Sequence, residues 1–388
     1  MPEARPIRAV FCHFTADVCG GSDRSLFDLV THLPRDRFSP AMILRSGDPL
    51  AGRYRDTGIP VIERTFVAPR RALQPLKLAR YFANFWPAAA GVARDLRRLR
   101  ADVVHVNTLF NLQGAAGARL ARRPLVWHVR ELVPDSKVAR VMLRLVAHLA
   151  ARPVANSTAV RDWLRASGAD PSLVFNGIDA SDFARLPDGG AFRREFGLST
   201  EDRVVVTIGR LEPWKGQHVF LEAAARVLPA HPETRFVVVG GAASNKPEYL
   251  DELRTRCKEL SIADRVLFTG IRQDIPGILA SADLLVLPSV TPEPFGRTVV
   301  EAMLAARPVI ATDGGGPRDT VLEGETGFLV PPGDAAALAL RIGALLEDPS
   351  RAGAMGARGR DRALAHFTLD RAVREMAQVL EDTAAAQR

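Results

Sequence analysis

Twelve short apolar segments recur along the chain, and stretches of helical character separate them. In the first half they are IRAVFCHF, PAMILRS, IPVIERT, DVVHVNT, PLVWHVR and RPVANST, and in the second RVVVTIGR, RFVVVGG, RVLFTG, ADLLVLPS, RPVIATD and GFLVPPG. Strands that are apolar almost throughout are typical of a parallel sheet covered by helices on both faces. Two such series predict two doubly wound, Rossmann-like α/β domains.

The segment LVFNGIDASDFARLPDGG separates the two series, and its Asn-Gly, Pro and Gly-Gly are typical of turns and linkers. We therefore predict an N-terminal domain over residues 1–185 and a C-terminal domain over residues 186–366. Residues 367–388 are predicted to form an amphipathic helix that packs back toward the N-terminal domain. A length of 388 residues agrees with two domains of similar size.

Composition favours a globular protein of the cytoplasm. The chain is 47% hydrophobic and 25% charged, and no apolar run approaches the roughly 18 residues that a membrane span needs. The N-terminus lacks the apolar stretch and cleavage site of a signal peptide. The three cysteines form no metal-ligand cluster, so we expect reduced thiols.

Charge is unevenly distributed. Residues 1–180 contain 27 Lys and Arg against 15 Asp and Glu, a net +12, whereas the remainder contains 25 against 29, a net −4. This asymmetry favours contact between the N-terminal half and an anionic surface, either lipid or nucleic acid. The alternative is a GC-rich genome that uses arginine freely. The chain lacks the zinc pattern, RNP motif and basic recognition helix of specific nucleic-acid binders.

Residues 66–100 interleave basic and aromatic side chains. These are Arg70, Arg71, Lys77 and Arg80 with Phe82, Phe85 and Trp86. One interpretation is a surface that docks peripherally on the inner face of an anionic membrane, which would favour a lipid-linked acceptor. The other is a helix whose aromatic face packs on the sheet while its arginines face water.

Ligands of open parallel sheets bind beyond the carboxyl ends of the strands, and polar motifs follow several strands here. In GRLEPWKGQ, Arg210 and Lys215 stand beside a helix N-terminus, as the neutralisation of a diphosphate would require. Solvated loop cations are the alternative. His128 ends another strand, where it could contact substrate or move a proton, although a lone histidine is often structural.

Two glycine-rich turns follow strands. Gly314-Gly315-Gly316-Pro317 allows close backbone approach, and Gly20-Gly21 precedes a helix for which Ser22 is the predicted N-cap. Neither turn has the GxGxxG spacing of a dinucleotide site, and no P-loop occurs.

In EPFGRTVVE, Glu293 lies in a loop after a strand, and Glu301 lies roughly two turns into the helix that Gly296 and Arg297 open. At about 10 Å apart, the two carboxylates could accept hydrogen bonds from two hydroxyl-bearing rings of one elongated ligand. They are too far apart to act as a pair on one glycosidic bond.

These motifs resemble those of the retaining nucleotide-sugar glycosyltransferases of family 4, which have the GT-B fold of two domains facing each other across a cleft. The resemblance rests on the two glutamates, the GRLEPWKGQ loop, FNGID, ADLLVLPS, GGGP and GETGFLVPPGD, and in the N-terminal half on GGS, DVVHVNT and WHVRE. It implies a donor-binding C-terminal domain and an acceptor-binding N-terminal domain. It also implies a nucleoside diphosphate sugar as co-substrate, with neither cofactor nor metal.

The resemblance further implies individual roles. Arg210 and Lys215 would hold the donor diphosphate, Glu293 the sugar hydroxyls and Glu301 the ribose hydroxyls. Phe295, Gly296 and Arg297 would line the loop around Glu293, His128 would lie near the reacting sugar, and Gly20 and Gly21 would lie near the phosphates and the acceptor. Members often carry a glutamate just after the glycine pair, where this chain has the shorter Asp23.

The expected activity is transfer of a hexose-type sugar to an acceptor hydroxyl, with the leaving diphosphate stabilised by Arg210, Lys215 and helix N-termini. No carboxylate is an evident nucleophile, so we expect the acceptor to attack the sugar from the same face from which the leaving group departs. Alternatives are an epimerase or phosphorylase of the same fold, or a non-catalytic basic protein that binds membrane or nucleic acid.

Overall fold

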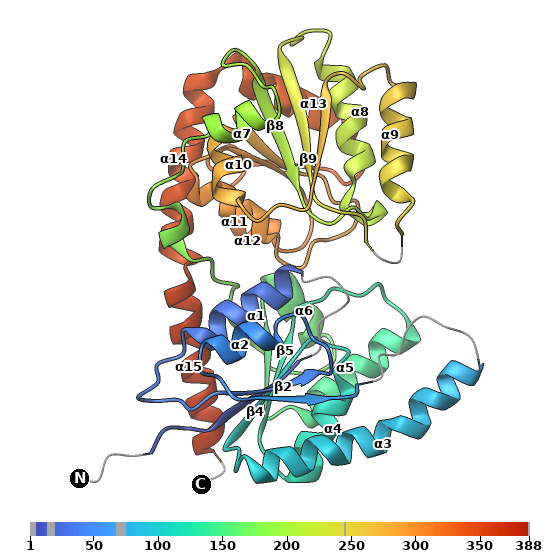
Figure 1. Ribbon diagram of the computed structural model, residues 1–388, viewed down its shortest axis with the longest axis vertical. Coiled ribbons are helices and arrows are strands. Elements are labelled where there is room, and N and C mark those ends of the chain that lie inside the picture. Colours follow the sequence, from blue (N-terminus) through green and yellow to red (C-terminus); the bar gives the residue numbers. More distant parts are fainter. Residues whose placement is uncertain (1–4, 14–19, 67–74, 244–245, 387–388) are drawn as a thin grey trace. The chain divides into compact units, whose positions relative to one another are not determined.

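All twelve predicted strands are present in the computed structural model, which describes residues 5–13, 20–66, 75–243 and 246–386, with only the backbone over 75–80 (Figure 1). They form two separate parallel sheets, which confirms the prediction of two doubly wound α/β domains. The first compact unit comprises Met1–Gly177 and Leu369–Arg388, and the second comprises Ile178–Thr368.

The first unit contains a seven-stranded parallel sheet of order β3-β2-β1-β4-β5-β6-β7. Its strands are β1 (Ala9–Cys12), β2 (Ala41–Arg45), β3 (Val61–Arg64), β4 (Val103–Asn107), β5 (Leu125–Val129), β6 (Arg152–Ala155) and β7 (Ser172–Leu173). Strand β7 was not predicted, because two residues carry no periodicity. The strand order reverses between β1 and β4, so ligands are expected beyond the carboxyl ends of these two strands.

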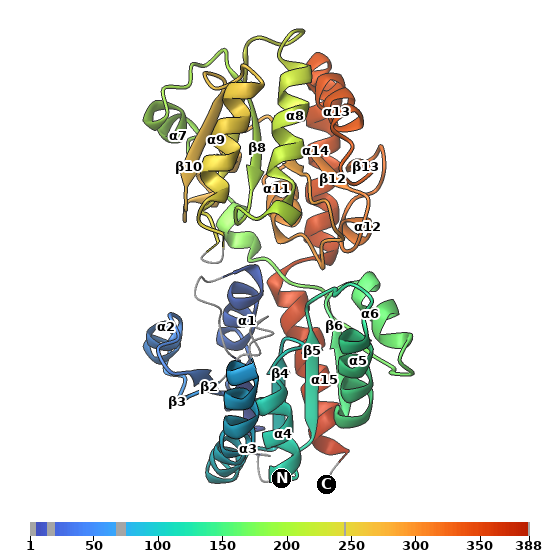
Figure 2. The ribbon, with the colours of Figure 1, turned by 90° about the vertical axis from the view of Figure 1, so that its right-hand side faces the viewer.

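Helices cover both faces of this sheet (Figures 1 and 2). One layer contains α1 (Gly21–Thr31), α2 (Ala51–Asp56) and α15 (Leu369–Ala385), and the other contains α3 (Pro75–Arg98), α4 (Leu112–Ala121), α5 (Lys137–Leu149) and α6 (Thr158–Arg165). Neighbouring residues of one strand face different layers: Val126 packs with α1 and α15, whereas Trp127 packs with α3 and α4. Burial on both faces explains why the strands are apolar throughout.

The second unit contains a six-stranded parallel sheet of order β10-β9-β8-β11-β12-β13. Its strands are β8 (Arg203–Ile208), β9 (Thr234–Val239), β10 (Val266–Gly270), β11 (Leu284–Leu287), β12 (Val309–Thr312) and β13 (Gly327–Val330). Its helices are η1 (Ala180–Phe183), α7 (Gly190–Glu195), η2 (Pro213–Lys215), α8 (Gln217–Val227), α9 (Tyr249–Glu259), α10 (Ile275–Ser281), α11 (Arg297–Leu304), α12 (Pro317–Thr320), α13 (Ala335–Glu347) and α14 (Pro349–His366).

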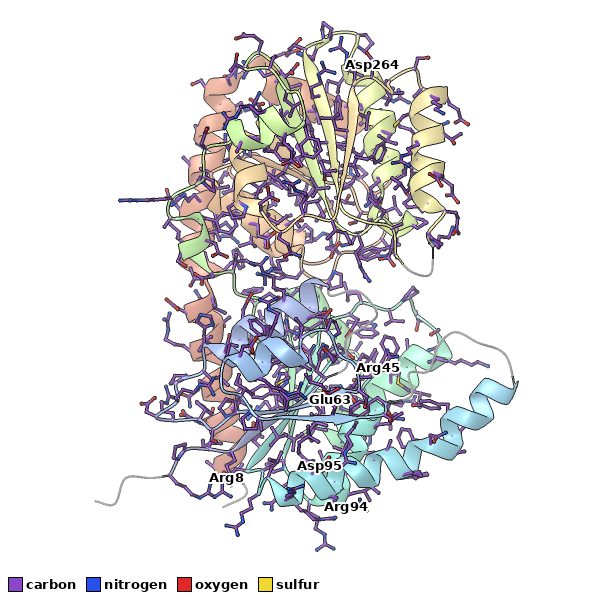
Figure 3. The ribbon with its side chains drawn as sticks, viewed as in Figure 1. Arg8, Arg45, Glu63, Arg94, Asp95 and Asp264 are labelled. Atoms are coloured by element: carbon purple, nitrogen blue, oxygen red, sulfur yellow. The ribbon has the colours of Figure 1, made fainter. Side chains whose placement is uncertain are left out.

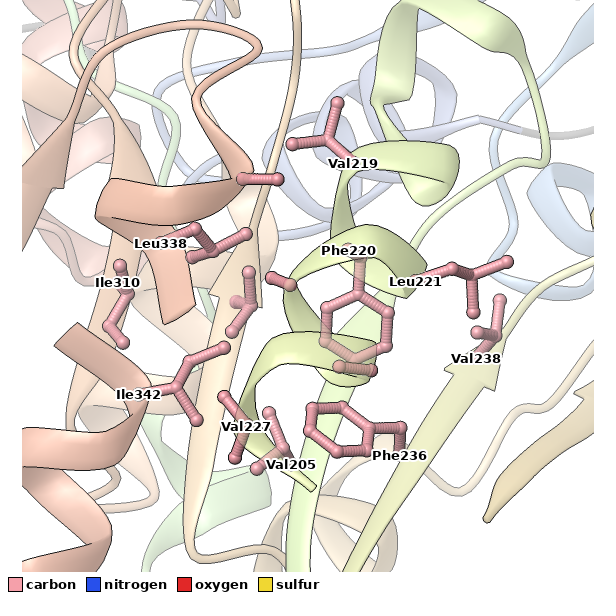
Figure 4. Packing of buried hydrophobic residues seen from close by; sticks show 14 of the residues in the cluster. Val205, Val219, Phe220, Leu221, Val227, Phe236, Val238, Ile310, Leu338 and Ile342 are labelled. Carbon is pink, nitrogen blue, oxygen red and sulfur yellow. The ribbon is translucent and has the colours of Figure 1, made fainter. Parts of the chain in front are cut away.

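The core on one face of this second sheet joins α8, α9 and α13 to the strands (Figure 4). Phe220 of α8 packs edge-on against Phe236 of β9 with ring centroids 5.5 Å apart, and Ile342 of α13 belongs to the same cluster. This packing holds the amino end of α8 beside the carboxyl end of β8, where the GRLEPWKGQ loop lies.

Residues 178–185 belong to the second unit, not to the first as predicted. The N–H of Ile178 donates to the carbonyl of Phe367 at 3.0 Å, and Arg360 of α14 donates to the carbonyl of Phe183 at 3.3 Å. The turn residues that marked the linker therefore begin the second unit. The terminal helix α15 starts at Leu369 rather than 367, and its Met376 is buried in the core of the first unit.

Helix α3 is anchored by its last turns. Arg64 of β3 donates through Nε and Nη2 to the two carboxylate oxygens of Asp95, each at 2.6 Å, and Asp95 is buried. Figure 3 labels Asp95 beside α3. A bidentate pair of this kind fixes both position and orientation. Among the described residues, no helix is both long enough and apolar enough to span a membrane.

Candidate functional site

The strand order of the second sheet reverses between β8 and β11, so the loops that follow these strands meet beyond the sheet. The N–H of Val290, after β11, donates to the carbonyl of Trp214, after β8, at 2.8 Å. Two motifs that are distant in the sequence therefore form one polar surface.

Lys215 and Glu293 form the centre of this surface. Lys215 Nζ lies 2.6 Å from Glu293 Oε2, and Ser289 Oγ donates to the same oxygen at 3.1 Å. Lys215 Nζ also lies 4.2 Å from the centroid of the Trp214 ring, within range of a cation–π interaction. The Glu293 side chain is nearly buried, whereas Lys215 retains some exposure, so the cation can be reached from solvent.

Arg210 pairs with an acid that the sequence analysis did not single out. Its Nη2 lies 3.2 Å from Glu212 Oε2, to which Trp214 Nε1 also donates at 3.0 Å. The Arg210 side chain is 40% exposed, so this ion pair is open to solvent and to ligands. Glu212 lies between Arg210 and Lys215 in the sequence. An acid between two cations of one loop is the sequence signal that could have identified it as an ion-pair partner.

Glu301 also has a cation beside it. Helix α11 starts at Arg297, after Gly296 with φ of 82°, so Glu301 lies just over one turn into the helix rather than two. Its Oε1 accepts from Arg297 Nε at 3.0 Å, and both side chains are nearly buried. The ring of Phe295 is buried and packs edge-on against Phe367, so only its backbone is available to a ligand.

The glycine turn after β12, residues 314–316, packs directly against the loop that carries Glu293. Gly316 N–H donates to the carbonyl of Glu293 at 2.8 Å, so it is not free to bind a ligand. A Cβ on Gly315 would lie 2.0 Å from the Glu293 carbonyl oxygen, and one on Gly316 would lie 2.3 Å from Phe295 Cα. The glycines therefore permit close approach of a second loop rather than of a ligand.

His128 lies in the other unit, at the carboxyl end of β5, and its side chain is buried. Its Nδ1 lies 3.3 Å from both His105 Nε2 and Arg130 Nη2. Burial, then the charge of Arg130 and then His105, hold the pKa of His128 well below its usual range. Burial also lowers the pKa of His105, to about 3, so both rings are neutral at pH 7.

Gly20 and Gly21 begin α1 in the first unit. The N-cap is Gly20 rather than Ser22, and its N–H donates to Asp23 Oδ2 at 2.5 Å. Asp23 is buried, and its other oxygen lies 2.7 Å from His13 Nε2. The shorter acid is therefore occupied within the protein. Glu131, the next residue after Arg130, accepts from the Arg130 backbone N–H at 3.1 Å.

The aromatic residues of α3 divide between core and solvent. Tyr81 is buried and Phe85 is half-buried, but Phe82 and Trp86 are each 63% exposed. The interpretation that the aromatic face packs on the sheet is therefore wrong for Phe82 and Trp86, two of the three rings that it named. The basic residues Arg70 and Arg71 lie outside the described residues, as do the side chains of Lys77 and Arg80.

Comparison with known families identifies the class. The Glycosyltransferase Family 4 model matches residues 19–182, and the Glycosyl transferases group 1 model matches residues 190–362. The two matches cover every strand of the two sheets except β1, together with Arg210, Lys215, Glu293 and His128. The chain belongs to the family 4 glycosyltransferases with the GT-B fold.

Individual relatives agree with this assignment. A GDP-mannose-dependent alpha-(1-6)-phosphatidylinositol monomannoside mannosyltransferase of Mycolicibacterium smegmatis is 37% identical over 212 residues, which are 51% of this chain and 54% of that protein. A D-inositol 3-phosphate glycosyltransferase of Acidothermus cellulolyticus is 28% identical over 92% of this chain and 80% of its own. The matches span only 54% to 66% of the length of three curated relatives.

A solved structure shows a similar fold over nearly the whole chain. The crystal structure of Anabaena HepE in complex with UDP-glucose has a TM-score of 0.84 and 29% sequence identity, and the match covers 97% of this chain and 100% of that one.

Proposed function

We propose that this chain transfers a hexose-type sugar from a nucleoside diphosphate sugar to an acceptor hydroxyl with retention of anomeric configuration. The observation that carries the proposal is the Lys215–Glu293 pair at the point where the second sheet reverses its strand order. A cation for the diphosphate and a carboxylate for sugar hydroxyls stand together there, in a chain of this family.

Donor binding would exchange partners within the ion pairs. Lys215 would turn from Glu293 to the diphosphate, and Arg210 would do the same from Glu212. Each freed carboxylate can then accept hydrogen bonds from hydroxyl groups, with Glu301 available for the ribose. The Arg210 side chain is exposed, which makes its exchange inexpensive, because exposed ion pairs contribute only about 0–1 kcal/mol. The Lys215–Glu293 pair is mostly buried, so Lys215 would leave Glu293 only as the diphosphate replaces it as partner.

The chemical step would break the bond between the anomeric carbon and the leaving phosphate oxygen, while the acceptor oxygen bonds to the same carbon from the same face. The acceptor proton would pass to the leaving phosphate. Negative charge grows on the diphosphate during this step, so Arg210 and Lys215 would stabilise the transition state more than the ground state.

The test is a panel of nucleotide sugars, including UDP-glucose and GDP-mannose, with products identified by mass spectrometry and NMR. These two donors are chosen because HepE binds UDP-glucose and the mycobacterial relative is GDP-mannose-dependent. A new glycoside with the donor's anomeric configuration supports the proposal. A converted donor without acceptor would indicate an epimerase instead, and an inverted product would exclude retention.

We also propose that the reaction needs no metal ion, because the two cations can neutralise the diphosphate. Activity in excess EDTA should equal activity in excess Mg²⁺ within about twofold, a difference of less than 0.5 kcal/mol in barrier height. A tenfold loss in EDTA that Mg²⁺ restores would contradict this.

For the acceptor, we propose a lipid-linked hydroxyl compound, reached by docking of α3 on the cytoplasmic face of an anionic membrane. Phe82 and Trp86 present two large exposed rings on a helix that begins in a basic segment. Helix α5 adds exposed Val138 beside exposed Lys137. Rings at the interface and cations at the head groups stabilise such docking. The phosphatidylinositol monomannoside named for the mycobacterial relative is a lipid.

Co-sedimentation with vesicles that contain anionic lipid tests the docking. The Phe82→Ser and Trp86→Ser double variant should bind at least about tenfold more weakly, and binding should fade with salt. The matched control is Ile271→Ser, because Ile271 is 66% exposed in the second unit. Equal loss in both variants, or no vesicle binding by the wild type at low salt, would leave a water-soluble acceptor as the better account.

A further inference from the structure

The carboxyl edge of the first sheet carries a buried chain of polar side chains that the proposed function does not explain. Its members are Asp23, His13, Asn107, Arg130, His128 and His105, and none is more than 5% exposed. Buried polar groups are costly unless they are hydrogen-bonded, so a network of this size invites a functional explanation.

Arg130 determines the direction of hydrogen bonds in this network, because a guanidinium only donates. Its Nε donates to Asn107 Oδ1 at 2.7 Å, and its Nη1 donates to Asn176 Oδ1. With its oxygen on Arg130, Asn107 must present its NH₂ group to His13 Nδ1, which lies 3.2 Å away.

The direction then propagates to the glycine turn. His13 Nδ1 accepts from Asn107, so the ring proton is on Nε2, which donates to Asp23 Oδ1 at 2.7 Å. Asp23 Oδ2 in turn accepts the N–H of Gly20 at 2.5 Å. The roles of Asn107, His13, Asp23 and the Gly20 N–H in these hydrogen bonds all follow from the donor-only character of Arg130.

The same reasoning applies to His128. Arg130 Nη2 faces His128 Nδ1 at 3.3 Å, and a proton on that nitrogen would place two donors against each other. His128 Nδ1 therefore accepts, and the ring proton is on Nε2. Within the described part of the chain, the buried Nε2 has no hydrogen-bond partner. Leaving such a donor unpaired is costly, so a substrate oxygen would gain by binding it.

His128 also lines a small pocket of the first unit. The other lining residues used here are Ser25, Arg130, Asn176 and Gly177, all of which belong to the same unit. The lining also includes Leu29, Val174, Phe175, Leu369 and Ala372, and the space admits about one oxygen atom, so an unpartnered donor on its wall suits a single hydroxyl oxygen.

We propose that Arg130 is a positioning residue that holds His128, which the family resemblance places near the reacting sugar, as the neutral Nε2–H tautomer and so directs this N–H to a hydroxyl oxygen. Through Asn107, His13 and Asp23, the same residue holds the N–H of Gly20 at the start of α1. The substrate contact rests on the proposed glycosyltransferase function, whereas the tautomer does not.

The first measurement is long-range ¹H–¹⁵N NMR of the histidine rings in the wild-type protein at pH 7. His128→Gln identifies the His128 signals among those of the eight histidines. We expect one neutral tautomer with the proton on Nε2. A proton on Nδ1, or on both nitrogens, would overturn the proposal, and this measurement needs no buried variant to fold.

The second measurement compares Arg130→Gln and Arg130→Lys with the control Arg165→Gln, since Arg165 is exposed on α6. Neither Arg130 variant can donate to all three acceptors, so both should give a mixture of tautomers. We expect kcat to fall by about tenfold, equivalent to one lost hydrogen bond, with less change in the donor KM. A wild-type tautomer and kcat in both variants would overturn the proposal. The Nε2–H tautomer in a protein that converts no nucleotide sugar would refute the proposed function but support the positioning.

Discussion

The two units carry polar groups at the same edge of the same kind of sheet, yet they arrange them differently. In the second unit, Arg210, Lys215 and Arg297 each pair with one carboxylate. In the first unit, His13, His105 and His128 belong to a buried hydrogen-bonded network around one guanidinium. The ion pairs of the second unit can exchange partners, whereas the network of the first unit cannot do so without exposing unpaired buried groups.

The difference follows from solvation. The partly exposed Arg210–Glu212 pair contributes little and can be replaced by a diphosphate at small cost, whereas the mostly buried Lys215–Glu293 and Arg297–Glu301 pairs separate only when a new charged partner is supplied. Buried networks lose the full desolvation penalty of every group left unpaired, so they resist rearrangement. We infer that the second unit adapts to its ligand, whereas the first presents a preformed surface.

The comparison depends most on Glu293. Glu293→Gln should lower kcat/KM by about a hundredfold or more, because a neutral amide both accepts more weakly and leaves Lys215 unpaired. Steady-state kinetics with the accepted donor would measure this, and circular dichroism would check folding. Glu323→Gln is the control, since Glu323 is half-exposed and remote in sequence. Near-wild-type turnover would show that Glu293 does not take part in the reaction.

Lys215→Ala tests whether the ion pairs serve the leaving group. Loss of one cation from the developing diphosphate should reduce kcat by about tenfold to a hundredfold. The exposed Lys258→Ala is the control. Calorimetry with the nucleoside diphosphate should show weaker binding to the Lys215 variant alone. Unchanged kinetics and binding would mean that Glu293 has a purely structural partner.

Gly316→Ala tests the support beneath the Glu293 loop. A Cβ there would lie 2.3 Å from Phe295 Cα, so the loop must shift, and we expect a loss of about 1–3 kcal/mol in unfolding free energy together with reduced activity. Gly314→Ala is the matched control, because its Cβ would meet Pro292 at an ordinary 3.5 Å. Equal denaturation midpoints for both variants would show that the contact is not needed.

The smallest expected effect is a loss of stability of the first unit at acid pH. The folded pKa values of His105 and His128 lie below the unfolded value near 6.5, so the unfolded chain binds more protons as pH falls below that value. Each histidine should lower the free energy of unfolding by up to about 1.4 kcal/mol for each pH unit below 6.5. The raised pKa of Glu131 opposes this loss of stability above pH 4.5. Melting temperatures at pH 7.5 and 5.5 measure it.

In this experiment the His128→Gln variant should show a smaller drop in melting temperature between the two pH values. His148→Gln is the control, because His148 is exposed on α5. A drop of the same size in wild type and both variants would show that the buried histidines do not govern acid sensitivity.

The strands could be predicted because burial on both faces leaves an apolar signature in the chain itself, as RVVVTIGR and ADLLVLPS illustrate. The positions of Arg210, Lys215 and Glu293 after such strands were equally evident. The pairing of Arg210 with Glu212 was missed, because a carboxylate between two cations gives no sign of which one it will contact. Residues 178–185 were assigned to the wrong unit, because turn residues mark a linker without showing which of the two flanking units it packs against.

The sequence by itself therefore determined the fold class, the family and the residues of the donor motif, since each depends on patterns along the chain. Only the tertiary structure decided which groups are paired. Arg130 and Asn107 lie 23 residues apart, and Lys215 and Glu293 lie 78 apart. A hydrogen bond depends on distances of a few tenths of an ångström, and parallel strands bring such residues together only after the sheet has formed.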